Sequence, residues 1–143
     1  MIDINLAVLP PKTTSQMKRQ VWTPKGPRFY KSGVQKAVEH DYLSLLSPYR
    51  PDAPIEGAVM LAVAFTWPHL AATPKRRRHL LVPKITRPDA DNIVKSLQDC
   101  LVKLRFVHDD GQIAKLVLEK FHGPDAQVGI RIQLAAMSEG ESC

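Results

Sequence analysis

Residues 87–95 read Arg-Pro-Asp-Ala-Asp-Asn-Ile-Val-Lys, and the pattern around them decides the fold. After them, apolar residues recur every three or four positions, which predicts an amphipathic helix from about Ala90 to Leu104. Asp89 stands at the expected N-cap, where an acid bonds free backbone N–H groups and favours the helix dipole. Capping accounts for one acid of the pair Asp89 and Asp91 without any further role.

Apolar patterns elsewhere predict four strands. Alternating residues predict one-faced strands at 2–8, 113–121 and 128–134, the last two forming a hairpin. The almost wholly apolar run 58–67 predicts a central strand covered on both faces. These strands share one mixed sheet.

An earlier helix completes the predicted fold. It is expected to begin at an N-cap, Ser32, and to run to about Ser47. The order is then β-α-β-α-β-β, an α/β (α+β) class with a single mixed sheet and two helices. We expect one domain over 1–136 and a flexible tail over 137–143.

Composition narrows the class of protein. With 44% hydrophobic and 24% charged residues, the 143-residue chain is globular rather than disordered. The formal net charge of +6 makes polyanions plausible partners. Two cysteines make no disulfide framework, and neither a membrane-spanning run nor a signal-peptide pattern is present, so we expect a soluble cytoplasmic protein.

Positive charge is concentrated in two long connections, 12–31 and 68–86. The first interleaves basic and aromatic residues, which suits DNA contact but equally suits a solvated loop whose aromatics pack on the core. A charge run is most often a solvated face, but the second run lies directly upstream of the acidic motif, which favours phosphate contact. The residues expected to bind DNA are Lys12, Lys18, Arg19, Lys75, Arg76, Arg77, Arg78, Lys84 and Arg87.

Carboxylates around the second helix suggest a metal site. Several carboxylates on a rigid frame can hold Mg²⁺, which prefers oxygen ligands and shares them with phosphate. Lys95 lies on the same helix face as Asp91, where it can contact phosphate or form an ion pair worth only ~0.3–0.5 kcal/mol. After the helix, Asp109 can simply open the turn that Asp110 and Gly111 continue.

The segments 89–95 and 109–113, together with Pro10-Pro11-Lys12, resemble the RusA family of Holliday junction resolvases, chiefly phage-encoded endodeoxyribonucleases. The resemblance implies that Asp89, Asp91 and Asp110 are the catalytic, metal-binding acids and that Lys95 is an essential lysine. It also implies Mg²⁺, with Mn²⁺ as a possible substitute, a homodimer, and branched double-stranded DNA as the substrate nicked on paired strands. We therefore expect the fold to gather the three acids around a cation.

Two other functions fit the same residues. A non-catalytic DNA-binding module would use the acids only as helix caps, and a broader nuclease would cut forks or flaps. A small-molecule enzyme is disfavoured because the chain lacks a glycine-rich phosphate loop and a Cys/His cluster with zinc spacing. His108 is expected to be a neighbour of the site rather than a ligand.

Overall fold

The computed structural model describes residues 1–12, 18–31 and 33–140, and the side chains of 1–12, 24–25 and 36–140. The strands are β1 (Ile2–Leu6), β2 (Lys18–Thr23), β3 (Gly26–Lys31), β4 (Val59–Pro68), β5 (Val82–Pro83), β6 (Ile113–Gly123) and β7 (Gly129–Ala136). The helices are α1 (Gly33–Leu46) and α2 (Ala90–Lys103), with short 3-10 turns η1 (Ser47–Tyr49), η2 (Lys75–Arg77), η3 (Asp110–Gln112) and η4 (Asp125–Gln127).

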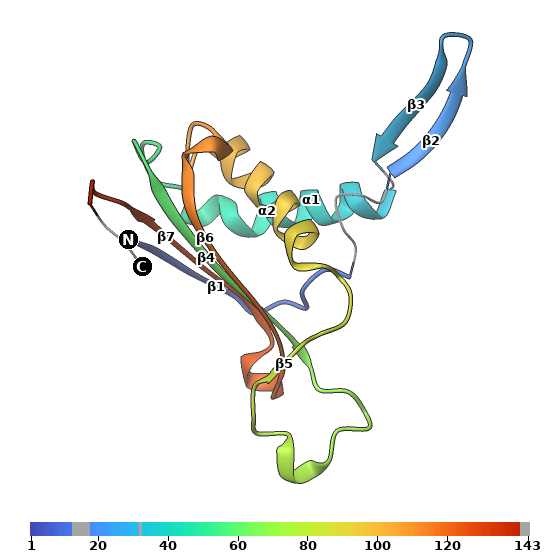
Figure 1. The fold of residues 1–143 in the computed structure, drawn as a ribbon, viewed down its shortest axis with the longest axis vertical. Helices are drawn as coiled ribbons and strands as arrows, with labels where there is room; N and C mark the ends of the chain where they lie inside the picture. The colour runs from blue at the N-terminus through green and yellow to red at the C-terminus, as the bar shows by residue number, and fades with distance from the viewer. Residues whose placement is uncertain (13–17, 32, 141–143) are drawn as a thin grey trace.

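One mixed sheet forms the centre of the molecule (Figure 1). Its strand order is β1-β7-β4-β6-β5, with β4 parallel to β6 and antiparallel to β7. The predicted class, a single mixed sheet with two helices, is confirmed, and so is the central position of β4. The bounds of α2 also match the prediction, because its apolar stripe depends only on local spacing.

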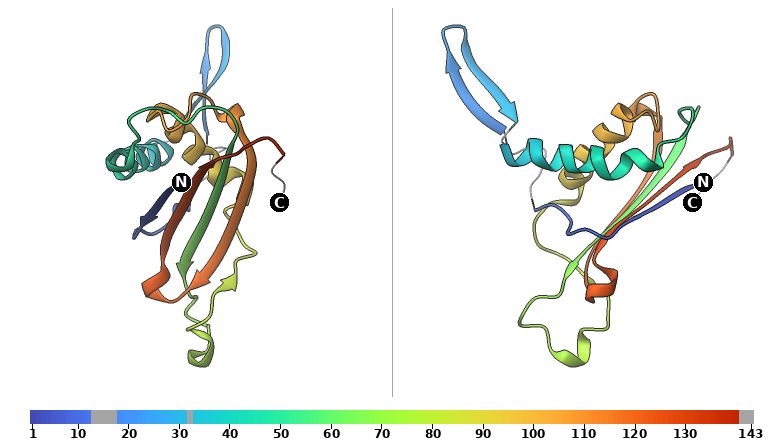
Figure 2. Two further views of the ribbon diagram at one scale, coloured as in Figure 1. Left: turned by 90° about the vertical axis from the view of Figure 1, so that its left-hand side faces the viewer. Right: turned by 180° about the vertical axis from the view of Figure 1, so that it is seen from behind.

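Two expectations about strand neighbours and faces are wrong. Strands β6 and β7 do not form a hairpin, because β4 lies between them and pairs with both. Strand β4 is not fully covered on both sides: its residues are alternately buried and half-buried from Val59 to Ala64, and the three from Phe65 to Trp67 are all buried. Both helices lie on one face of the sheet, and small residues such as Ala62 and Ala64 occupy the other (Figure 2).

The core lies between β4 and the helices. Leu61 and Phe65 of β4 are fully buried, as are Leu97 and Leu101 of α2. The buried thiol of Cys100 approaches the carbonyl oxygen of Glu39 on α1 at 3.8 Å, so it marks the contact between the two helices. This packing fixes α2 against the sheet and thereby fixes where the acidic motif lies.

Both long connections contain structure that the sequence pattern did not reveal. The first holds the hairpin β2–β3, which stands away from the sheet (Figure 1), and the second holds η2 and β5. The proposed cap Ser32 lies outside the described residues, and so do the last three residues of the predicted tail. Met137, the first residue of that tail, donates its N–H to the carbonyl of Ala58 at 2.8 Å. Across the described ranges, neither helix is long and apolar enough to cross a membrane.

Candidate active site

The entrance of α2 presents two exposed acids. Asp89 has extended backbone angles at the N-cap, and its carbonyl accepts the first helical bond from Ile93 at 3.0 Å. Its side chain makes no capping hydrogen bond, so the carboxylate is not used to satisfy the helix end. Asp91 is also exposed, one turn before Lys95, and no ion pair joins Asp91 to Lys95. The ordinary explanations for these residues, a cap and an i,i+4 pair, are therefore not what the structure shows.

Lys120 of β6 ties the approach to this entrance onto the sheet. Its ammonium donates to the carbonyl oxygens of Thr86 at 2.8 Å and Pro88 at 2.7 Å. The peptide between Arg87 and Pro88 is cis, and Pro88 is buried. Because these bonds hold the backbone at Thr86 and Pro88, within three residues of Asp89, Lys120 positions the acid pair.

A group of lysines surrounds the same approach. The ammonium of Lys84 lies 5.1 Å from the ring centroid of Trp67 and donates to the hydroxyl of Thr86 at 2.9 Å. Burial, and after it the positive charges of Lys120 and Lys12, lower the pKa of Lys84. Concentrated positive charge near exposed carboxylates is suited to binding the phosphate backbone of DNA. The phosphates would neutralise the lysine ammonium groups, and the carboxylates would remain available to bind a cation.

The turn η3 presents Asp110 on a rigid support. Asp109 caps it by accepting from the N–H of Gly111 at 3.3 Å, as predicted for a residue that opens a turn. The Gln112 amide oxygen accepts from the N–H groups of His108 and Asp109, at 2.6 and 3.1 Å. Its NH₂ group donates to the carbonyls of Ile55 and Gly57, at 2.8 and 2.9 Å. Asp110 itself is exposed.

The two acidic segments lie at opposite ends of β6. The turn η3, which Asp110 begins, directly precedes this strand, whereas Lys120, near the other end of the strand, holds the backbone before Asp89. The seven residue steps from Ile113 to Lys120 span about 23 Å. Among the described residues, no three His, Cys, Asp or Glu side chains are close enough together to hold a metal ion.

A single chain therefore does not form the expected three-acid cage. Because β4 and β6 are parallel, the connection through α2 must return along the sheet, which separates Asp110 from Asp89 and Asp91. The remaining pair still suits Mg²⁺, since this ion is commonly held by one or two carboxylates together with water and phosphate oxygens.

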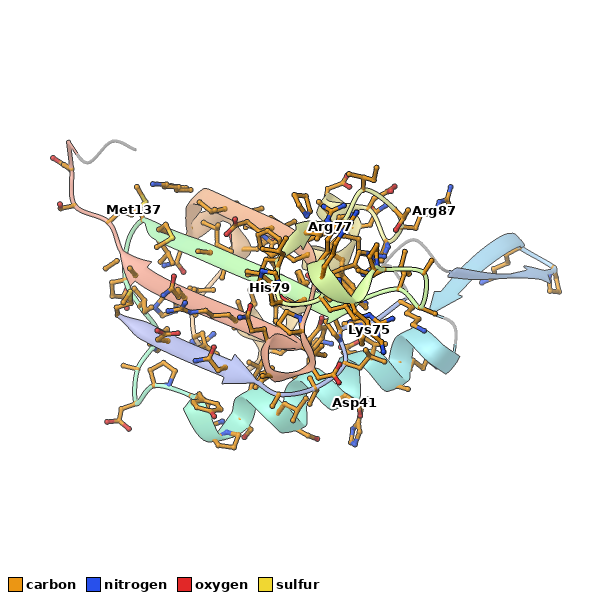
Figure 3. The ribbon with its side chains drawn as sticks, turned by 90° about the horizontal axis from the view of Figure 1, so that it is seen from below. Asp41, Lys75, Arg77, His79, Arg87 and Met137 are labelled. Atoms are coloured by element: carbon orange, nitrogen blue, oxygen red, sulfur yellow. The ribbon has the colours of Figure 1, made fainter. Side chains whose placement is uncertain are left out.

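The other predicted DNA contacts are spread over the surface. The exposed turn η2 consists of Lys75, Arg76 and Arg77. In Figure 3, which views the molecule from below, the label of Arg87 lies closer to the β2–β3 hairpin than those of Lys75 and Arg77. The guanidinium of Arg78 instead donates to the carbonyls of Thr73 and Ala71, so it shapes the loop. Of the first connection, Lys12 joins the lysine group, and the side chains of Lys18 and Arg19 lie outside the described residues.

Two residues of the site were not identified from the sequence. Lys120 was not singled out from the sequence. It continues the strand face that carries the apolar Leu116 and Leu118, and a charged residue at that position was a detectable signal. Gln112 was noted only as part of a motif, and its full set of four hydrogen bonds could not be foreseen because two of its partners, Ile55 and Gly57, come from a segment far away in the sequence.

Comparison with known proteins identifies the family to which this chain belongs. The profile of the endodeoxyribonuclease RusA family matches residues 9–133. The crossover junction endodeoxyribonuclease rusA of Lactococcus phage r1t is 43% identical over 49 residues, which cover 34% of this chain and 37% of that protein. The uncharacterized protein YqaN of Bacillus subtilis (strain 168) is 30% identical over 99 residues, which cover 64% of this chain and 69% of that protein. Since the family profile spans most of the chain, this protein belongs to the RusA endodeoxyribonuclease family.

Proposed function

We propose that this protein is a metal-dependent endodeoxyribonuclease that resolves four-way DNA junctions by paired nicks during recombination and repair in the cytoplasm. Family membership and the name of the phage relative support the reaction class. The observation that carries the proposal is that Asp89 and Asp91 are both exposed, and that Asp89 makes no side-chain capping bond, at a helix entrance approached by the lysine group of Lys12, Lys84 and Lys120.

The acid pair is the part of the site that would hold Mg²⁺, or Mn²⁺ in its place. When bound there, such an ion supplies polarisation of the scissile phosphate and a more acidic water. The chain's own contribution is to place the carboxylates: Lys120 fixes the backbone that leads into Asp89, and packing of α2 on the sheet fixes Asp91. Lys95, exposed one turn further on, would stabilise negative charge that develops on the phosphate.

The lysine group would bind the DNA backbone beside the acids. Each phosphate contact releases counterions, so affinity for the junction should fall steeply as salt is raised. The exposed turn η2 and Arg87 extend the positive surface along the same connection. Binding by lysines and chemistry by acids are thus separate properties that substitutions can uncouple.

The decisive experiment compares Asp91→Asn with Asp99→Asn on a synthetic four-way junction. Asp99 lies further along α2 and serves as the matched control. We expect Asp91→Asn to reduce Mg²⁺-dependent cleavage about a hundredfold or more while leaving junction binding intact, and Asp99→Asn to cleave normally. Cleavage by Asp91→Asn at the parent rate would show that Asp91 is not a metal ligand.

One observation favours a second function, a DNA-binding module without catalysis. Asp110 is not assembled with Asp89 and Asp91 in one chain. Salt-sensitive junction binding with no cleavage in either Mg²⁺ or Mn²⁺ would support this alternative. Where cleavage does occur, its rates on junction, fork, flap and plain duplex decide between a junction resolvase and a broader nuclease.

A further inference from the structure

We propose that Arg50 and Arg105 form a second phosphate-binding site, at the end of α2 far from the acid pair. In this proposal the site holds a backbone phosphate of the DNA about seven base pairs away from the phosphate that is cut. That the ligand is DNA rests on the proposed function. That the site takes a phosphate group follows from the residues that form it.

Helix α2 ends in a turn that usually contains glycine. The N–H of Phe106 donates to the carbonyl of Leu101 at 2.9 Å, and the N–H of Arg105 donates to the carbonyl of Val102 at 3.0 Å. These two bonds define a Schellman motif, in which the residue after the C-cap takes a left-handed backbone conformation. That residue is Arg105, with a φ of 64°. Among the residues that the structure describes, it is the one non-glycine residue with a positive φ.

An arginine at this position costs stability that a glycine would not. The Cβ atom is strained in the left-handed conformation, and the interaction of a cation with the helix dipole offsets only part of that cost. The side chain of Arg105 is exposed, and its guanidinium makes no ion pair or hydrogen bond with the described part of the chain. A strained residue whose charged group has no partner in its own chain points to a ligand.

A second arginine lines the same surface hollow. The hollow measures about 410 Å³, and it is lined by Arg50, Pro51, Asp52, Pro54 and Arg105. Arg50 is also exposed, and it too has no ion pair within the described ranges. The two arginines and the one aspartate give the hollow a net charge of +1. Two guanidinium groups around one hollow can donate to several oxygens of one phosphate.

The backbone on both sides of the hollow is fixed. Two prolines of the lining have their φ angles locked by their rings. The N–H of Ile55 donates to the carbonyl of Phe106 at 2.9 Å, and Ile55 forms a parallel bridge with Val107. These contacts join the segment that carries Arg50 to the turn that carries Arg105. Because both segments are held before the ligand arrives, less conformational entropy is lost on binding.

The length of α2 determines which phosphate the site would hold. In Figure 1, α2 runs from the connection that carries the acid pair to the turn before β6. Arg105 lies 16 positions after Asp89 (105 − 89), which is about 24 Å at 1.5 Å per residue. Base pairs of a duplex are about 3.4 Å apart, so a duplex along α2 with one phosphate at the acid pair has another at the arginines about seven base pairs away. Two exposed arginines hold a free phosphate weakly, whereas a DNA backbone that the lysine group also binds stays at a high local concentration.

The first test measures junction binding without cleavage, in the absence of divalent metal. Arg105→Gly and Arg50→Gln should each weaken binding about three- to tenfold, and each should reduce the slope of log affinity against log salt by about one. Arg131→Gln is the control, because Arg131 lies beside Ala64 on the sheet face that the helices leave open. It should bind like the parent protein.

The same variants are checked for stability. Glycine relieves the strained turn, so the melting temperature of Arg105→Gly should stay level or rise by up to about 4 °C. A lower melting temperature would mean that the arginine stabilises the end of the helix, and it would overturn the proposal. Folded variants of both arginines that keep the parent's affinity and salt slope would overturn it as well.

The second test locates the phosphate. Methylphosphonate replaces one charged phosphate at a time along a junction arm, and the cut is mapped with the parent protein. The parent should lose affinity when the uncharged group lies about seven base pairs from the cut, and Arg105→Gly should be insensitive to that replacement. Equal profiles for the two proteins would overturn the assigned position.

The third test needs neither DNA nor activity. Inorganic pyrophosphate is titrated into isotope-labelled protein, and the Nε–H signals of Arg50 and Arg105 are followed by nuclear magnetic resonance. Both signals should shift and reach saturation. If they do so in a protein that never cleaves junctions, the proposed function is refuted and the phosphate site stands. If they stay still in a protein that cleaves junctions, the site is refuted and the nuclease stands.

Discussion

The sharpest test of the described structure is to remove the Gln112 amide. Its four hydrogen bonds join the turn that presents Asp110 to the segment before β4, through Ile55 and Gly57. Gln112→Met keeps the length of the side chain and removes all four bonds. Gln98→Met, at a half-buried glutamine on α2, is the matched control.

The expected loss follows from the number and exposure of these bonds. Each hydrogen bond contributes about 0.5–1.5 kcal/mol net. Gln112 is only half-buried, so water replaces some of the lost partners, and we expect the free energy of unfolding to fall by about 2–3 kcal/mol. Gln112→Glu keeps the acceptor for His108 but turns a carboxylate toward two carbonyl oxygens. Its deficit should therefore shrink as the pH falls and the new carboxyl regains a proton to donate.

Urea unfolding followed by tryptophan fluorescence measures both effects. The transition midpoint should drop for Gln112→Met with an unchanged slope, and should not move for Gln98→Met. A loss below about 0.5 kcal/mol in the free energy of unfolding would mean that the Gln112 amide contributes no more than an ordinary surface side chain. A pH-independent deficit for Gln112→Glu would contradict the assigned donor and acceptor directions.

Three further outcomes are expected. Lys120→Met should reduce junction cleavage about a hundredfold by loosening the backbone before the acid pair, whereas Lys36→Met on α1 should not; equal rates would refute the positioning role. Burial, and next the positive charges of its lysine neighbours, lower the pKa of Lys84 from the ordinary 10.5. As the pH rises, DNA binding by the parent protein should therefore weaken at a lower pH than DNA binding by Lys84→Arg, whose side chain stays charged. The same pH dependence of DNA affinity in both proteins would contradict this. Tyr42→Phe should raise the melting temperature, gaining up to about 1 kcal/mol, because the buried hydroxyl has no hydrogen-bond partner within the described part of the chain; a clear loss of stability would refute that reasoning.

Local patterns in the sequence predicted the elements well. The stripe of Ile93, Leu97 and Leu101 depends only on helical spacing, and the alternation before Leu134 depends only on the strand repeat, so both survive any tertiary arrangement. Strand neighbours are a different matter. Alternation gives a strand one apolar face but does not choose its partner, which is why the hairpin of β6 with β7 was wrong.

The candidate site was predictable to the same extent. Asp89, Asp91 and Lys95 fall within two turns of one helix, so spacing alone places them together. Asp110 and Lys120 are placed by the direction of β6, which no local pattern reports. The expected cage failed within one chain because it required a closure that a parallel crossover forbids.

Cys100 gives this molecule an internal reporter. Its sulfur is sealed between α1 and α2, so a thiol reagent reaches it only when the helices part. In a Cys143→Ser background it is the one thiol in the sequence, and its labelling rate measures how often that seam opens. Slower labelling with junction DNA present would mean that the substrate clamps the two helices together.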